Sequence, residues 1–335
     1  MNWRHLEIID GGSGMNKIGF LISTKENEKR RAILPNQLLN IKNKDYLYFE
    51  KGYGDDLGYS DDEYIKQGVH VLEKKDILNL DVLCDPKIGD ADYLLDMKDN
   101  KILFGYIHAV QNQKLTDLLI QKKATAIAWE DMHYRGRHTF WRNNELAGEA
   151  AIMHAFTLYG KLPYDCKVAI IGRGNTSRGA YRILASLGAD IAVYNRKTQK
   201  LLRDEVGKYD VIVNCVLWDT SRTDHIIYKS DLKNMKKNAM IVDVSCDLKG
   251  AIETTVPTSI EDPVYTVDDV LHYAVDHTPS MIGETSSKVF GDVVARYVDF
   301  IIEGDFKNNV TLKEAIVIEN GKIIDERINV FQKRP

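Results

Sequence analysis

A glycine-rich turn between an apolar run and a helix pattern constrains the fold of this chain more than any other feature. The apolar run 168–171 leads into the turn Gly172-Arg173-Gly174-Asn175-Thr176-Ser177, and a helical pattern follows. Strand, tight turn and helix in this order open a βαβ unit, in which backbone N–H groups at the helix N-terminus bind phosphate. The sequence therefore predicts a nucleotide-binding domain in which residues 172–177 contact the cofactor. The alternative is a tight turn in an unrelated α/β protein.

The residues after the second predicted strand select the cofactor. Strand 191–194 is followed by Asn195-Arg196-Lys197, where NAD enzymes usually carry an acid for the ribose 2′-hydroxyl. A neutral residue followed by two cations suits a 2′-phosphate, so the predicted cofactor is NADP(H). The alternative is that both cations are solvated surface charges. The predicted cofactor contacts also include the end of strand 210–216, at Cys215, Val216 and Leu217.

Composition and charge narrow the class of protein. The length of 335 residues predicts two domains, and 44% hydrophobic with 28% charged residues is ordinary for a globular protein. A net charge of −4 gives no reason to expect nucleic acid or an anionic membrane as a partner. No apolar run approaches the roughly 20 residues that cross a bilayer. We therefore expect a cytoplasmic protein without nucleic-acid or membrane partners.

The cysteines favour reduced thiols in a core over a disulfide framework or a metal site. Cys84, Cys166, Cys215 and Cys246 are far apart and form no C-x-x-C motif. Three of them lie in or beside predicted strands. We expect buried thiols and no bound metal.

Strands and helices alternate along the chain, which predicts parallel sheets. In the first half, strands are expected at 17–22, 46–49, 69–71, 81–83, 102–107 and 125–129, with helices at 35–42, 61–67 and 114–122. A helix capped by Asn143-Asn144-Glu145 runs to about Tyr159. The second unit has expected strands at 167–171, 191–194, 210–216, 240–244 and 263–266. A helix at 283–303 and a hairpin at 316–324 with an Asn-Gly turn follow.

This order predicts an α/β fold of two Rossmann-like domains with parallel sheets. Residues 144–275 would form the NADP(H)-binding domain, and 15–143 together with 276–335 the substrate domain. Residues 1–14, which end in Gly11-Gly12-Ser13-Gly14, are expected to be a flexible extension. The active site would lie in the interdomain cleft, at the carboxyl ends of both sheets.

Four polar residues follow apolar strands and could carry chemistry. Arg30 comes after the first strand, where it could bind a substrate carboxylate, although a charged loop is the simpler alternative. Lys87 and His108 each end a strand and would project into one crevice, where a structural histidine is the alternative reading. Asp247 ends a strand of the nucleotide unit, near the expected position of nicotinamide.

Together these residues resemble the alanine dehydrogenase family, which includes transhydrogenase domains and lysine-forming saccharopine dehydrogenases. The resemblance covers Met15 to about Arg296 and rests on spaced motifs: Asn27-Glu28-x-Arg30-x-Ala32-x-x-Pro35, Lys87 with His108, Asp247, and Tyr273-x-Val275-x-x-x-Pro279. It implies that Arg30 binds a carboxylate, that Lys87 and His108 are catalytic, and that Asp247 lies beside nicotinamide. Pro86 departs from the family pattern, because it precedes the lysine instead of following it.

Two further motifs resemble the saccharopine enzymes more than alanine dehydrogenases. Asp276-His277-Thr278-Pro279 is similar to their Asp-His-x-Pro, and Trp129-Glu130 with Arg137 is similar to their amino-acid contacts. The resemblance therefore implies that Glu130, Arg137, Asp276 and His277 bind a substrate larger than ammonia.

As a whole the chain resembles the opine-forming members of this family. That likeness implies reductive condensation of pyruvate with the side-chain amine of L-ornithine, using NADPH, with L-lysine as a second candidate amine. A homo-oligomer is expected. The alternatives are an alanine dehydrogenase, a saccharopine-type dehydrogenase, and a non-catalytic NADP(H)-sensing module.

Overall fold

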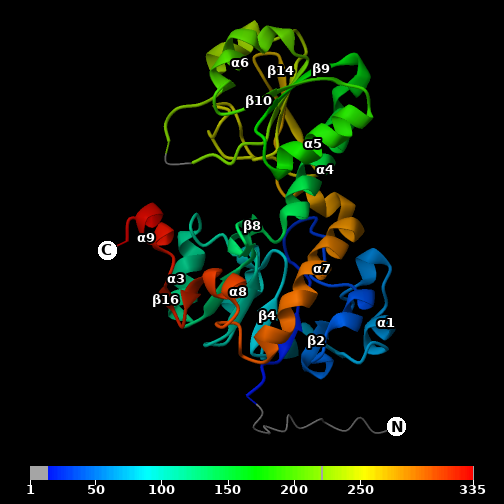
Figure 1. The fold of residues 1–335 in the computed structure, drawn as a ribbon, viewed down its shortest axis with the longest axis vertical. Coiled ribbons are helices and arrows are strands. Elements are labelled where there is room, and N and C mark those ends of the chain that lie inside the picture. Colours follow the sequence, from blue (N-terminus) through cyan, green and yellow to red (C-terminus); the bar gives the residue numbers. More distant parts are fainter. Residues whose placement is uncertain (1–13, 220–221, 335) are drawn as a thin grey trace.

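The protein forms two lobes, each built on its own sheet (Figure 1). The computed structural model describes residues 14–219 and 222–334, so the expected extension 1–14 lies outside the described residues except for Gly14. The larger sheet takes strands from both ends of the chain, whereas the smaller sheet uses strands between residues 167 and 273. The predicted α/β fold with two Rossmann-like sheets is confirmed.

The larger sheet has eight strands in the order β16-β15-β6-β5-β4-β1-β2-β3. Its parallel part, β1 to β6, follows the doubly wound order 3-2-1-4-5-6. The strands are β1 (Ile18–Phe20), β2 (Leu47–Glu50), β3 (His70–Leu72), β4 (Val82–Cys84), β5 (Ile102–Gly105), β6 (Thr125–Ala128), β15 (Ile316–Glu319) and β16 (Lys322–Ile323). The last two form the expected hairpin, where Asn320 and Gly321 both adopt positive φ, at 49° and 74°.

Helices cover both faces of this sheet. On one face, Phe290 and Val294 of α7 (Gly283–Ile302) share a buried core with Val82 and Cys84. On the other face, Leu119 of α3 (Gln113–Gln121) shares a second core with Leu83, because successive residues of a strand point to opposite sides. The other helices of this lobe include η1 (Pro35–Asn40), α1 (Asp61–Ile65), α2 (Lys74–Ile77), η4 (Ile88–Asp90), η5 (Asp92–Leu95), η10 (Thr278–Ile282), α8 (Val310–Glu314) and α9 (Glu326–Gln332).

The smaller sheet has the order β10-β9-β11-β12-β14-β13, in which only β13 is antiparallel. Its strands are β9 (Lys167–Ile171), β10 (Asp190–Tyr194), β11 (Val211–Asn214), β12 (Met240–Asp243), β13 (Val264–Val267) and β14 (Val270–Tyr273). The helices of this lobe include α5 (Asn175–Ser186), α6 (Gln199–Glu205), η8 (Val206–Lys208) and η9 (Lys229–Asn234). Since β10 and β11 flank β9 on opposite sides, the chain reverses direction across the sheet between β9 and β11, where α/β proteins bind nucleotides.

Helix α4 (Trp141–Tyr159) connects the two lobes and lies against α5 (Figure 1). Two glycines allow this close approach. A side chain at Gly148 would collide with the carbonyl oxygen of Thr176, and one at Gly179 would collide with that of Glu145. The first residues of α4 belong to the lower lobe, so one rigid helix joins the substrate-side residues to the glycine-rich turn.

Most predicted elements are confirmed, and four differ. Segment 35–42 forms a 3₁₀-helix that ends at Asn40, and α4 begins at Trp141, so the expected cap at residues 143–145 is wrong. Strand β14 was not predicted, because its tight turn from β13 uses Asp268 and Asp269, at φ 47° and 61°, instead of an Asn-Gly pair. The short hairpin of β7 (His133–Tyr134) and β8 (Arg137–His138) was not predicted either.

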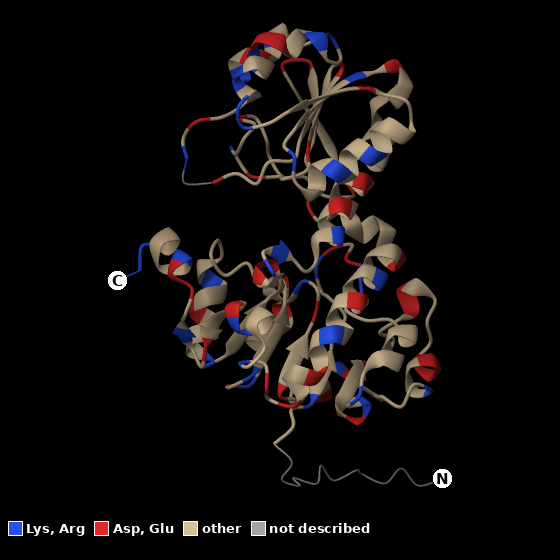
Figure 2. Ribbon diagram, viewed as in Figure 1, with Lys and Arg blue, Asp and Glu red and all other residues tan. Residues whose placement is uncertain are grey.

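The distribution of surface charge and the burial of the cysteines match what the sequence predicts. Basic and acidic residues are interspersed over both lobes (Figure 2). Cys84, Cys166, Cys215 and Cys246 are all buried free thiols. Across residues 14–219 and 222–334, no helix combines the length and apolar character needed to span a membrane.

Candidate active site

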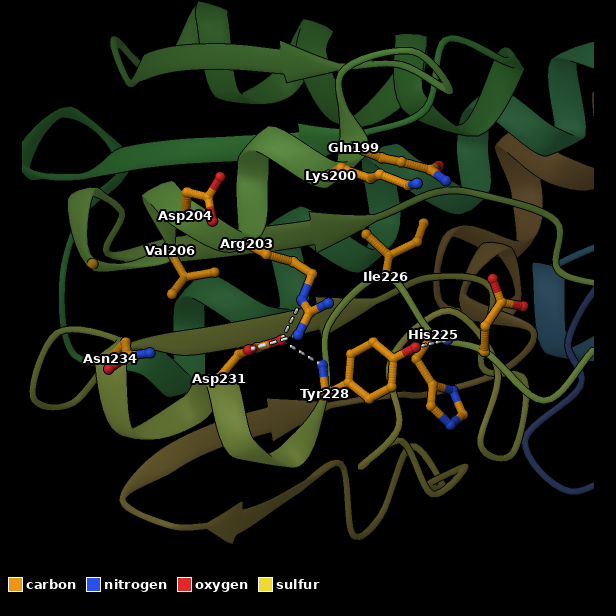
Figure 3. Close-up of a pocket in the computed structure, with 12 residues that line it drawn as sticks. Gln199, Lys200, Arg203, Asp204, Val206, His225, Ile226, Tyr228, Asp231 and Asn234 are labelled. Atoms are coloured by element: carbon orange, nitrogen blue, oxygen red, sulfur yellow. Dashed lines mark hydrogen bonds and ion pairs between the residues drawn. The ribbon is translucent and has the colours of Figure 1, made fainter.

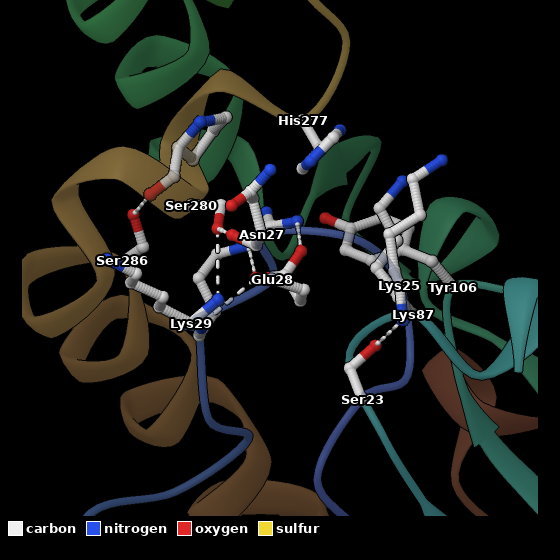
Figure 4. Close-up of polar contacts among 12 residues, drawn as sticks. Ser23, Lys25, Asn27, Glu28, Lys29, Lys87, Tyr106, His277, Ser280 and Ser286 are labelled. Carbon is white, nitrogen blue, oxygen red and sulfur yellow. Dashed lines mark hydrogen bonds and ion pairs between the residues drawn. The ribbon is translucent and has the colours of Figure 1, made fainter. Parts of the chain in front are cut away.

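The carboxyl ends of β1 and β4 bring together the residues that were predicted to bind and activate a substrate. These two strands are neighbours, and their connections leave in opposite directions across the sheet. Such a reversal opens a crevice at the strand ends. The loop after β1 supplies Arg30, and the turn after β4 supplies Lys87. Figure 4 shows Lys87 beside Lys25, Glu28, Tyr106 and His277.

Arg30 is buried in an ion pair with Glu28. Its side chain is 2% exposed, and its Nε and Nη2 donate to the two Glu28 oxygens at 2.8 and 2.5 Å. Burial opposes ionisation of Glu28, but the charge and hydrogen bonds of Arg30 outweigh it, so the pKa of Glu28 lies below its ordinary value. Arg30 is therefore not a solvent-exposed charge, while its role in binding a carboxylate stays a prediction. Sequence reasoning assigned no role to Glu28, although it stands two residues before Arg30 in the same motif.

A third residue, Asn143 of α4, holds the other side of Arg30. Its Oδ1 accepts from Arg30 Nη1 at 3.3 Å, and its Nδ2 donates to Tyr106 Oη at 3.4 Å. Asn143 is 113 positions away from Arg30 in the sequence, so no local pattern could have indicated this contact. The guanidinium is thus held by Glu28 from its own loop and by Asn143 from α4.

Lys87 is a desolvated amine. Its side chain is 13% exposed, and its Nζ lies 3.7 Å from Asp90 Oδ2. Burial lowers the pKa of Lys87, and the positive charge of Arg30 adds to this effect. A lysine that loses its proton more readily than usual suits the role of a base.

His108 follows the neighbouring strand β5 in a left-handed conformation, with φ 53°. Its backbone N–H donates to Glu130, whose other oxygen accepts the N–H of Ile107 at 3.1 Å. The His108 ring stacks on Tyr106, with 5.8 Å between ring centroids, and its Nδ1 lies 3.8 Å from Glu130. Glu130 therefore orients His108, which is half exposed and can reach a ligand.

The predicted amino-acid contacts are divided between two places. Asp276 contacts the His277 ring and lies 3.2 Å from Lys25 Nζ, which in turn lies 3.6 Å from Asp90. These residues are next to Lys87. Arg137 is separate: it is exposed on β8, with its guanidinium 3.8 Å from the centre of the Trp141 ring.

The glycine-rich turn fits a phosphate. Gly172 has φ 114°, which only glycine adopts readily, and its carbonyl accepts from Ser177 Oγ at 2.8 Å. A side chain at Gly174 would meet open space, and within the described residues α5 has no side-chain hydrogen bond at its N-cap. These N–H groups are therefore available to an anion, with Arg173 exposed and the peptide groups of Asn175 and Thr176 in the same first turn.

The predicted 2′-phosphate site follows β10. Asn195 Oδ1 accepts the backbone N–H of Lys197 at 2.8 Å, and the Asn195 N–H donates to Thr198 Oγ1 at 2.9 Å. This turn leaves the side chains of Arg196 and Lys197 exposed, and neither forms an ion pair within the described part of the chain. Both cations are available to a ligand.

The third predicted cofactor segment and Asp247 lie at the adjoining strand ends. A side chain at Gly172 would come within 3.2 Å of the Cys215 carbonyl, so the turns after β9 and β11 are in contact. Val216 is half-buried and Leu217 is 92% exposed. Asp247 accepts the Trp218 N–H at 3.4 Å, and burial, with a smaller contribution from Asp243, raises its pKa to about 6.

A groove of about 860 Å³ lies in the nucleotide lobe between α6 and residues 224–234 (Figure 3). Arg203 donates to Asp231 at 3.0 Å across it. The groove begins at Gln199, two residues after Lys197, and contains none of the predicted catalytic residues. The residues predicted to carry the chemistry therefore lie at the strand ends, outside this groove.

Known proteins resemble this chain over most of its length. The family model "Alanine dehydrogenase/PNT, N-terminal domain" matches residues 22–140, and "Alanine dehydrogenase/PNT, C-terminal domain" matches 195–326. The NAD-binding domain model of D-isomer-specific 2-hydroxyacid dehydrogenases matches 132–247.

Individual relatives agree with these matches. N(5)-(carboxyethyl)ornithine synthase of Clostridium botulinum is 31% identical over 84% of this chain and 93% of that relative. Alanine dehydrogenase 1 of Staphylococcus aureus is 23% identical over 90% of this chain and 93% of its own length. A solved L-alanine dehydrogenase superimposes with a TM-score of 0.83 over 95% of this chain and 99% of the other, at 20% identity, and so shares the fold.

Proposed function

This chain belongs to the alanine dehydrogenase/PNT family and is an oxidoreductase that uses a pyridine nucleotide, and on that premise we propose that it joins pyruvate to the side-chain amine of L-ornithine. The product would be N5-(1-carboxyethyl)-L-ornithine, with NADPH as reductant. The observation that carries this proposal is a desolvated Lys87 beside a buried, aimed Arg30 at the ends of β1 and β4. The choice of substrates rests on the relative from Clostridium botulinum.

The proposed chemistry needs a free amine, a proton donor and a fixed keto acid. Arg30 would bind the pyruvate carboxylate so that one face of the carbonyl is presented to the cofactor. Lys87 would take a proton from the attacking ammonium, and His108 would protonate the hydroxyl group that leaves as water. The bound cofactor supplies the hydride that reduces the resulting C=N bond.

The second substrate would lie on the polar residues next to Lys87. Asp276, His277 and the Glu130 carboxylate would bind the ammonium group of the amino acid. Arg137 would contact the same substrate from the hairpin β7–β8. Asp247 would lie beside nicotinamide. In the nucleotide lobe, residues 172–177 would hold the phosphates, and Asn195, Arg196 and Lys197 the 2′-phosphate.

A panel of amines tests this function. We expect rapid NADPH oxidation with pyruvate plus ornithine, weaker turnover with lysine and little with ammonia, because a diamine held at both ends is selected by its length. If ammonia is the best amine, the alanine dehydrogenase alternative replaces the proposal. If 2-oxoglutarate with lysine is preferred to pyruvate with ornithine, a saccharopine-type dehydrogenase replaces it. The relatives, named as a synthase and a dehydrogenase, give no support to a non-catalytic sensing module.

The cofactor preference is a separate prediction. We expect kcat/KM to be higher with NADPH than with NADH, because Arg196 and Lys197 have no competing ion pair in the described chain. A hydrogen bond to a charged group contributes about 1.5–3 kcal/mol, so Arg196→Ala should weaken NADPH binding by roughly 10- to 150-fold and NADH binding little. Lys200→Ala, on the next helix, is a matched control. Equal efficiency with both cofactors would contradict the assignment.

A further inference from the structure

Asp85, the residue directly after β4, is a buried carboxylate that the proposed mechanism does not use. It is fully buried, and no side-chain nitrogen of a lysine, arginine or histidine in the described chain forms an ion pair with it. A buried carboxylate without a cationic partner is costly to ionise, and burial raises the pKa of Asp85 to about 6. Carboxylates with strongly shifted pKa values cluster at functional sites, so the contacts of Asp85 are of functional interest.

Its hydrogen bonds connect Asp85 to Lys87. Asp85 Oδ1 accepts the backbone N–H of Lys87 at 2.8 Å, and Oδ2 accepts from Tyr93 Oη at 2.7 Å. An aspartate that accepts the N–H two residues ahead closes a tight turn. The residue inside this turn is Pro86, whose ring restricts its own φ and disfavours helical backbone at Asp85.

The turn 85–89 also packs closely against β5 and the residues that follow it. A side chain at Gly105 would collide with the Asp85 carbonyl, and one at Gly89 would collide with the Ile107 carbonyl. The N–H of Gly89 donates to the Tyr106 carbonyl at 2.9 Å. The backbone of the turn is thus held by β5 and the residues after it, and the Asp85 side chain adds a hydrogen bond at the N–H of Lys87.

The charge of Asp85 is not the main influence on Lys87. The charges that most affect the lysine are those of Arg30, Asp90, Lys25 and Glu28. Asp85 acts on the lysine through its hydrogen bond to the backbone.

We propose that Asp85 is a positioning residue: by holding the N–H of Lys87 from beneath the turn, it keeps the lysine amine in the desolvated crevice where it meets the substrate. This inference rests on the proposed function of Lys87 as the base. It also explains why a proline can precede this lysine, since Asp85, Pro86 and Lys87 form one rigid turn.

The test compares Asp85→Ala, Asp85→Asn and Tyr93→Phe. For each variant we would measure kcat and KM, and follow the acylation of Lys87 against pH by competitive labelling and mass spectrometry. In Asp85→Ala we expect kcat to fall by about 10- to 100-fold, the scale of a displaced catalytic group, with a smaller change in KM for pyruvate. The labelling midpoint of Lys87 should rise towards that of an exposed lysine, because the amine leaves the crevice.

The two other variants separate positioning from stability. The amide oxygen of Asp85→Asn can still accept the Lys87 N–H, so kcat and the labelling midpoint should stay within about threefold and a few tenths of a pH unit of the wild type. Tyr93→Phe removes the hydrogen bond at Asp85 Oδ2 and should lower the melting temperature without moving the labelling midpoint.

Three results would overturn the inference. A folded Asp85→Ala variant with unchanged kcat and labelling would show a purely structural residue. An inactive Asp85→Asn variant with normal labelling would show that the carboxyl group itself transfers a proton, and this comparison does not need the alanine variant to fold. If Tyr93→Phe shifts the labelling midpoint of Lys87 as much as Asp85→Ala does, the shift comes from a general loss of packing around Asp85 and not from its hydrogen bond to Lys87. The two proposals can fail separately. If the wild type does not catalyse the reaction of pyruvate with ornithine, the proposed function is wrong, but the labelling of Lys87 still tests the role of Asp85.

Discussion

Lys87→Met is expected to reduce kcat by about 100-fold or more while the fold and NADPH binding are retained, because general acid–base catalysis contributes on this scale. The side chain is mostly buried, and in the described part of the chain its amine forms an ion pair only with the partly exposed Asp90, at 3.7 Å, so an apolar replacement of similar length leaves no unpaired buried charge. His108→Gln should have a similar effect on kcat. Its ring is 48% exposed, so the substitution should cost little stability.

The pH dependence gives a second readout of the same prediction. A base must be deprotonated to act, so kcat/KM should fall as the pH drops through the pKa of Lys87. Since burial and Arg30 lower this pKa below the ordinary 10.5, the fall should begin at a lower pH than for an exposed lysine. In Lys87→Met this decrease of kcat/KM at low pH should be absent.

Lys114→Met, at an exposed position of α3, is the matched control and should behave as the wild type. Near-normal turnover of Lys87→Met or His108→Gln would remove that residue from the mechanism. Unfolding of either variant would show that it serves the fold.

Arg30→Met is expected to lower both stability and pyruvate binding. It leaves the carboxylate of Glu28 buried without its partner, and breaking a buried pair from one side costs about 3–5 kcal/mol in the free energy of unfolding. Loss of a charged hydrogen bond to the keto acid should lower kcat/KM for pyruvate by roughly 10- to 150-fold. Denaturant unfolding and steady-state kinetics measure the two effects.

A double variant separates these effects. In Arg30→Met with Glu28→Gln, neither position carries a charge, so no unpaired charge is buried there. The double variant should therefore recover much of the lost stability but none of the lost kcat/KM for pyruvate. Recovery of both would show that Arg30 acts only through the fold.

The stability difference between Arg30→Met and the wild type should also depend on pH. In the wild type the pKa of Glu28 lies below its ordinary 4.5, so the pair stabilises the protein above that pH and less as the pH falls below it. In the variant, protonation of Glu28 at low pH removes the free-energy cost of burying its carboxylate without a partner. The difference should therefore shrink as the pH is lowered towards 4, and an unchanged difference would contradict the buried-pair interpretation.

Local patterns predicted the elements that local physics controls. The glycine-rich turn was identified because Gly172 needs a positive φ and phosphate binding needs uncapped N–H groups, and both requirements act within six residues. The hairpin at 316–324 was found because its Asn-Gly turn suits two positive φ angles. Strand β14 was missed because Asp268 and Asp269 adopt the same conformation without the usual sequence signal.

The sequence by itself determined the α/β alternation, the nucleotide turn, and the candidates Arg30, Lys87 and His108, since strand periodicity and turn chemistry depend on near neighbours. Only the tertiary structure decided what surrounds these side chains. Glu28 neutralises Arg30 because both are buried together, Asn143 reaches Arg30 from 113 positions away, and Glu130 orients His108 across two strand ends. Burial, ion pairing and desolvation depend on which segments the fold brings into contact, and a linear pattern does not contain that information.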